Sequence, residues 1–142
     1  MKSCFFIGHR KASTEILPIL TEAVERHIVQ FGVREFIVGN YGGFDRMAAK
    51  AVIASKAQYP EITLSLMIPY HPSEHPVACP AGFDNTFYPP DMERVSRRLA
   101  IIRANRYMVD HVDYLIAYAW PPSPQATHEI YWNTHKNGKR GT

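Results

Sequence analysis

Apolar and polar residues along this chain alternate between two patterns, one typical of strands and one typical of helices. Short apolar runs at 2–8, 35–39, 62–68 and 114–119 are typical of buried parallel strands. Segments of helical character lie between them at 13–31, 46–58 and 91–110, and a last helix is expected over 127–137. Strands that alternate with helices predict an α/β fold, a three-layer sandwich whose mostly parallel sheet of about four to five strands carries helices on both faces. The 142 residues are enough for a single domain.

The helix over 13–31 has the clearest start and end signals. Ser13 or Thr14 can cap it, Pro18 fits its first turn, and Gly32 can end it. Its packed face is predicted from helical spacing: Ile16, Leu20, Ala23, Val24, His27, Ile28 and Phe31. For the helix over 91–110, the packed side is expected to hold Val95, Leu99 and Ile102.

Residues 39–45, GNYGGFD, join a predicted strand to a predicted helix. Glycines allow a tight turn and close approach of a ligand, and the N–H groups of a helix N-terminus suit a phosphate. The candidate ligand-binding residues here are Gly39, Asn40, Gly42, Gly43, Phe44 and Asp45. The alternative is a structural turn in which Asp45 is the N-cap of the helix. The stretch is neither the dinucleotide G-x-G-x-x-G motif nor a P-loop, because no GK[ST] follows.

Two other loops follow predicted strands. Gly8, His9 and Arg10 come directly after the first; Arg10 could bind a phosphate or carboxylate, and His9 a ribose or base. The loop 121–127 follows the fourth strand and ends at Thr127, a further candidate. Ligands of parallel α/β sheets bind at the carboxyl ends of the strands, so we expect all three loops at one edge. The alternative for Arg10 is a solvated side chain in a plain turn.

Arg103, Arg106 and Asp110 share one face of the helix over 91–110. Two arginines backed by a carboxylate could clamp an anion. A solvated stripe of ion pairs explains the same spacing equally well, so both interpretations stay open.

Residues 69–90 hold six of the eleven prolines, which predicts a long loop or lid. His71, His75 and Cys79 recur within it every four residues, and each is followed by proline. Such a spacing cannot lie on one face of a regular helix, and no fourth ligand is near in sequence. We therefore expect no metal site.

Composition favours a cytoplasmic protein that spans no membrane. No apolar run approaches the length of about 20 residues that a membrane helix needs, and the N-terminal apolar run is too short for a signal peptide. Two cysteines suggest no disulfide framework. The net charge of +3 is mild and its basic residues are spread out, which makes nucleic acid an unlikely partner. No motif for nucleophilic catalysis is present, and the candidate catalytic carboxylates are Asp45 and Asp110.

Three motifs resemble one known group. Residues 4–10, CFFIGHR, resemble the FxGHR opening of the SLOG superfamily, in particular its YpsA-like branch of bacterial and phage proteins. Residues 39–49, GNYGGFDRMAA, are similar to the branch's GGxxGFDxxAA, and 98–117 resemble its RNRxMVDxxDxLIA. The resemblance implies a Rossmann-like sheet and a pocket for nucleotides or nucleotide derivatives, lined by Gly8, Arg10, Gly42, Gly43 and Asp45 with Arg106 and Asp110. It also implies kinship with the LOG phosphoribohydrolases and the DNA-processing protein DprA.

The chain departs from these relatives in two places. Residues 121–127 read PPSPQAT where the family carries a glycine pair, and Ile130 stands in place of the glutamate of the LOG motif PGGxGTxxE. Relatives also continue into a last strand after GK, so we expect a missing or very short edge strand, with the sheet edge open or covered in a homodimer.

We therefore expect a module that binds a small nucleotide derivative, with no cofactor and no established catalysis. One alternative is a LOG-like hydrolase of nucleoside monophosphates that uses Asp45 or Asp110. The other is single-stranded DNA binding in the manner of DprA, which would weaken steeply with salt.

Overall fold

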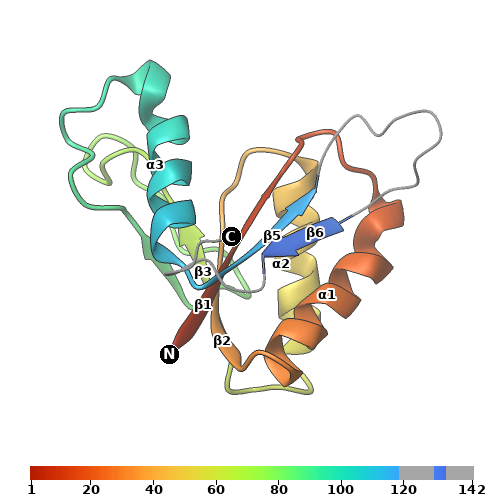
Figure 1. Ribbon diagram of the computed structural model, residues 1–142. Helices are drawn as coiled ribbons and strands as arrows, with labels where there is room; N and C mark the ends of the chain where they lie inside the picture. Colours follow the sequence, from red (N-terminus) through yellow and green to blue (C-terminus); the bar gives the residue numbers. More distant parts are fainter. Residues whose placement is uncertain (119–129, 134–142) are drawn as a thin grey trace.

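The computed structural model describes residues 1–118 and the backbone of 130–133 (Figure 1). The chain begins with β1 (Lys2–Gly8), the short 3-10 helix η1 (Thr14–Ile16), α1 (Leu17–Val29), β2 (Val33–Val38) and α2 (Gly43–Ser55). It continues with β3 (Thr63–Met67), β4 (Asn85–Phe87), α3 (Arg97–His111), β5 (Tyr114–Tyr118) and β6 (Ile130–Asn133). None of the described helices is long and apolar enough to cross a membrane.

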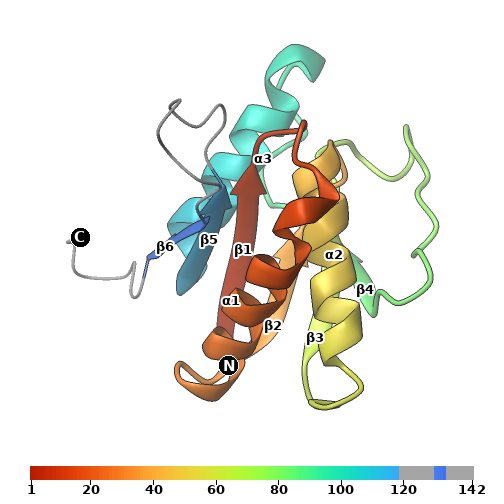
Figure 2. The same cartoon turned by 90° about the vertical axis from the view of Figure 1, so that its right-hand side faces the viewer.

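The strands form one sheet in the order β4-β3-β2-β1-β5-β6. The pairs from β4 to β5 are parallel, and β6 runs antiparallel to β5. In the centre of the sheet, Phe5 of β1 lies between Ile37 of β2 and Leu115 of β5. Helices α1 and α2 cover one face of the sheet and α3 covers the other (Figure 2). The predicted three-layer α/β sandwich is confirmed, and the described residues contribute six strands to its sheet, where about four to five were expected.

The alternation of side chains along each strand divides the core into two layers. Phe6, Phe36 and Leu64 point toward α1 and α2, whereas Phe5, Ile37 and Met67 point toward α3. The predicted face of the first helix is confirmed: Ile16, Leu20, Ala23, Val24, His27 and Ile28 are all buried, and Phe31, beyond the end of α1, packs half-buried against the same core. Ser13 accepts a hydrogen bond from the Glu15 N–H, and Gly32 has the left-handed φ of 72° expected at a helix end.

The expected start of the third helix is wrong, and so is its expected packed side, except that Val95, just before the helix, packs half-buried against the core. The helix begins at Arg97 rather than at Asp91, which has a φ of 62° that no right-handed helix accepts. Leu99 and Ile102 are 46% and 62% exposed, and the buried positions are Ala100, Ala104 and Met108. Small side chains let a helix axis approach the sheet closely, so the alanine face packs and the larger residues turn outward.

The last expected helix is also wrong where the structure describes it. Residues 130–133 form β6, which pairs Ile130 with Tyr118 and Asn133 with Leu115. The run Ile-Tyr-Trp is rich in β-branched and aromatic side chains, which favour a strand. This short strand pairs with the edge of β5, where we expected a missing or very short strand.

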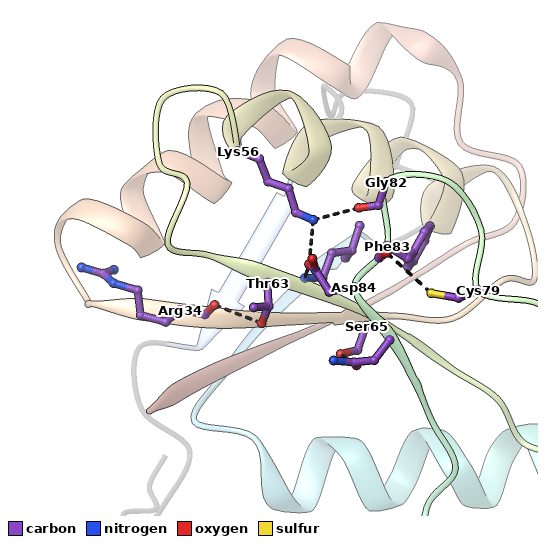
Figure 3. Close-up of polar contacts among 10 residues, drawn as sticks. Arg34, Lys56, Thr63, Ser65, Cys79, Gly82, Phe83 and Asp84 are labelled. Atoms are coloured by element: carbon purple, nitrogen blue, oxygen red, sulfur yellow. Dashed lines mark hydrogen bonds and ion pairs between the residues drawn. The ribbon is translucent and has the colours of Figure 1, made fainter.

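Residues 69–90 are mostly irregular, as predicted, but they contain β4 at the edge of the sheet. Asp84, just before β4, ties it in place: its carboxylate accepts the Leu64 N–H at 2.8 Å and lies 2.6 Å from the Lys56 ammonium (Figure 3). Lys56 also donates to the Gly82 carbonyl at 2.8 Å. These bonds anchor the proline-rich segment to the end of α2.

Candidate functional site

The two predicted loops after β1 and β2 lie against each other, as expected for the carboxyl edge of the sheet. A Cβ added to Gly42 would stand 2.3 Å from the Arg10 Cβ, and one added to Gly43 would stand 2.5 Å from the Ala12 carbonyl oxygen. The Gly43 N–H donates to the Arg10 carbonyl at 2.6 Å. Both glycines are therefore required for this close contact of loops, and the Gly43 amide is already used by the chain itself.

Gly8 and Phe44 form a second close contact in the same region. A Cβ on Gly8 would stand 2.5 Å from the Phe44 ring. Phe44 is fully buried and stacks on Tyr118 with ring centroids 5.7 Å apart. The structure thus places this candidate ligand-binding residue in the core.

Asp45 is not the N-cap of α2, which corrects the structural alternative for this residue. The cap position is Gly42, and Asp45 lies within the first turn. Its carboxylate turns back and accepts the Tyr41 N–H at 3.0 Å. A carboxylate in the first turn is favoured by the helix dipole, and here it also fixes the entry of the chain into the helix.

A small hollow of about 70 Å³, the edge hollow, opens beside this carboxylate. Its lining comes from β1, the glycine loop and α3, and includes Gly8, Gly39, Tyr41, Gly42, Asp45 and Asn105. Burial raises the pKa of the Asp45 carboxyl, while the hydrogen bond from the Tyr41 N–H and the charge of Arg46 act in the opposite direction. The edge hollow therefore presents one carboxylate with an increased affinity for a proton.

Tyr41 also lines a neighbouring hollow of about 200 Å³, the lid hollow, with Asn40, Pro69, Tyr70, His75 and Val77. Burial, with Tyr70 and Asp45 nearby, raises the pKa of Tyr41 to about 12, so its hydroxyl keeps its proton at neutral pH. The Arg97 guanidinium lies 4.8 Å from the Tyr70 ring centroid and bonds His75. The carboxyl edge of the sheet therefore carries aromatic rings and a cationic group in addition to Asp45.

The structure brings together some of the predicted residues and separates others. The edge and lid hollows contain Gly8, Gly39, Asn40, Gly42 and Asp45. Arg10 is exposed in the adjoining loop, and the His9 ring nitrogen Nδ1 accepts the Lys11 N–H at 3.0 Å. Thr127 lies outside the described residues.

The arginine face of α3 does not meet the glycine loop. Arg103, Arg106 and Asp110 are exposed on its outer side, and Ile101 and Asn105 line the edge hollow in their place. Of the two candidate catalytic carboxylates, only Asp45 reaches a hollow at the carboxyl edge.

Several residues of this edge were not among the predicted ones: Tyr41, Tyr70, His75, Arg97 and Asn105. Tyr70 lies three residues after the end of β3, in the loop that follows this strand, so the same rule that singled out the loops after β1 and β2 could have found it. His75 and Asn105 come from a loop and a helix face whose placement depends on tertiary packing, and the spacing of His75 with His71 and Cys79 points to a metal rather than to this edge.

Among residues 1–118, no three His, Cys, Asp or Glu side chains lie close enough together to hold a metal ion. His71 contacts Ser73, and Cys79 bonds the Phe83 carbonyl. No protein-family model and no curated protein matches this chain.

Proposed function

We propose that the carboxyl edge of this sheet binds a nucleotide or a nucleotide derivative. The observation that carries the proposal is the pair of adjoining hollows that share Tyr41 and extend from Asp45 to Tyr70 and His75. Two of the motifs that resemble the SLOG superfamily, at 4–10 and 39–49, fall on this edge.

Each part of a nucleotide has a partner of suitable chemistry here. The Asp45 carboxylate can accept hydrogen bonds from ribose hydroxyls, as acidic residues do in dinucleotide-binding folds. The rings of Tyr41 and Tyr70 offer stacking surfaces for a base. Arg10, exposed in the loop after β1, and Arg97, which contacts the Tyr70 ring, can neutralise phosphate oxygens through paired N–H donors.

This arrangement changes the expected place of the phosphate. The Gly43 N–H donates to the Arg10 carbonyl, and the Asp45 carboxylate beside it would repel an anion. A phosphate is therefore better held by the arginines than by the amides of the glycine loop.

Calorimetric titration with AMP, ADP-ribose and NAD tests this proposal. The variants are Asp45→Asn and Arg10→Ala, and Lys11→Ala is the matched control for loss of a neighbouring positive charge. Removal of a charge-assisted hydrogen bond costs about 1.5–3 kcal/mol, so we expect about tenfold or greater weakening in Asp45→Asn and Arg10→Ala only. The proposal fails if none of the three nucleotides binds at millimolar concentration, or if the variants bind as tightly as the wild type.

A second candidate, hydrolysis of a nucleoside monophosphate, rests on Asp45. Its burial in the edge hollow and raised pKa suit a group that exchanges a proton near a bound ribose. Release of adenine from AMP would then disappear in Asp45→Ala and persist in Asp110→Ala, whose carboxylate is exposed outside the hollow. Equal loss in both variants, or no release by the wild type, would exclude this activity.

A further inference from the structure

A second hollow lies at the opposite end of the strands, between the sheet and the last turns of α3. Its volume is about 390 Å³, within the range of about 300–1,000 Å³ that is usual for ligand sites. We call it the polar groove. Its floor is formed by Ser3, Glu35, Thr63, Ser65 and Asn85, which come from four neighbouring strands.

The register of the strands shows that this floor is a continuous polar row. Ser3 pairs with Glu35, and Glu35 pairs with Thr63. Two residues further along β3, on the same face of the sheet, Ser65 pairs with Asn85. Figure 3 shows Ser65 on the side of the sheet that faces α3, opposite Lys56 and Asp84. Nearer the carboxyl ends of the strands, on the same face of the sheet, Phe5, Ile37 and Met67 form an apolar layer that packs against α3. Polar side chains on a face that a helix otherwise covers are unusual for a parallel sheet, whose two faces are normally apolar.

The wall of the polar groove is aromatic. Tyr107 and His111, one turn apart on α3, stack with ring centroids 3.9 Å apart and an angle of 18° between their planes. Phe87 of β4 lies against Tyr107, with centroids 6.1 Å apart. A flat ring that entered the groove would meet aromatic surface on this side and hydrogen-bonding groups on the floor.

The charges around the polar groove select against phosphate. Glu35 is the acidic residue of the lining, and none of the described residues that line the groove is Lys or Arg. The Ser65 hydroxyl donates to Oδ1 of Asn85, which leaves the amide NH₂ of Asn85 to donate to a ligand. The floor therefore offers a carboxylate that accepts and an amide that donates.

We propose that the polar groove binds an uncharged, hydrogen-bonding heteroaromatic compound of the nucleobase or nucleoside type. The ring stacks beside Tyr107, and an N–H group on its edge donates to the Glu35 carboxylate. The site is separate from the carboxyl edge and does not depend on the function proposed for it.

Titration of the ¹⁵N-labelled protein with adenosine, guanosine and cytidine tests this inference, with free ribose and AMP as comparison ligands. We expect at least one nucleoside to shift the amide signals of Ser65 and Asn85. The Glu35→Gln substitution should weaken its binding about tenfold or more, because it removes the charge from the acceptor. Glu61→Gln, which changes an exposed carboxylate of the Arg34 ion pair outside the groove, is the matched control and should bind like the wild type.

AMP should bind the polar groove more weakly than adenosine does, since its phosphate gains no cationic partner there. The inference is overturned if no nucleoside shifts these signals at millimolar concentration, or if a correctly folded Glu35→Gln variant binds with unchanged affinity. It is also overturned if ribose alone produces the same shifts, which would make the groove a sugar site. Shifts confined to Gly39 and Tyr41 would place the nucleoside at the carboxyl edge instead.

Discussion

Gly43, the first residue of α2, offers a direct test of how the glycine loop packs. The sign of the stability change on replacing it by alanine shows whether this glycine is needed for a close contact or only makes the helix more flexible. Replacing glycine by alanine in a helix normally stabilises it, by about 0.8–1 kcal/mol. At Gly43, however, the new Cβ would lie 2.5 Å from the Ala12 carbonyl oxygen and 2.8 Å from the Arg10 carbonyl oxygen. Both contacts are with backbone atoms, which cannot turn away as a side chain can.

The expected magnitude follows from these distances. Overpacking of a well-packed site costs about 1–3 kcal/mol. The displaced loop would also weaken the 2.6 Å hydrogen bond from the Gly43 N–H to the Arg10 carbonyl, a loss of about 0.5–1.5 kcal/mol. After subtraction of the helical gain, Gly43→Ala should destabilise the protein by about 0.5–4 kcal/mol.

Urea unfolding, followed by circular dichroism, measures this difference. The control is the pair Lys50→Ala and Lys50→Gly at an exposed position of α2, where alanine should be more stable than glycine by about 1 kcal/mol. If Gly43→Ala proves as stable as the wild type or more stable, the close contact of the two loops does not exist in solution and the reasoning is refuted.

Further predictions follow from burial and from titration. On α3, Leu99→Ala should change stability by less than about 0.5 kcal/mol and Met108→Ala should cost about 2–5 kcal/mol, both measured in urea; the opposite order would contradict the observed packing. A thiol reagent should modify exposed Cys79 rapidly, and Cys4, whose buried thiol has a raised pKa, only upon unfolding; fast reaction of both would contradict this. Because the pKa of Asp45 is raised in the folded state, its carboxyl favours folding below its unfolded pKa of about 3.8, and this contribution is lost as the pH rises through the folded pKa. Asp45→Asn should therefore be at least as stable as the wild type at pH 7 and lose that advantage near pH 3. A variant less stable than the wild type at pH 7 would contradict the direction of this pKa shift.

The parts of the fold that could be predicted are those determined by local periodicity. β1 is a short apolar run that ends at Gly8, and the packed face of α1 repeats with the period of a helix. The meeting of the loops after β1 and β2 also follows from the sequence, because parallel strands end at the same edge.

The parts that could not be predicted depend on contacts between distant segments. Which face of α3 packs is decided by how closely Ala100 and Ala104 let the helix approach the sheet, and the apolar spacing of Leu99 and Ile102 favoured the wrong side. The role of Gly42 and Gly43 depends on the loop at 10–12, which lies some 30 residues away in sequence and leaves no local trace. The polar row of the groove is visible only once the register of four strands is known.

The most direct test of the account is to locate nucleotide binding by titrating the ¹⁵N-labelled protein with AMP, ADP-ribose and NAD. We predict that at least one of them shifts the amide signals of Gly39, Tyr41 and Asn105, which line the hollows at the carboxyl edge, and that Asp45→Asn reduces these shifts at equal ligand concentration. An absence of shifts at millimolar ligand, or shifts confined to the outer face of α3 around Arg103 and Arg106, would contradict a nucleotide site at this edge.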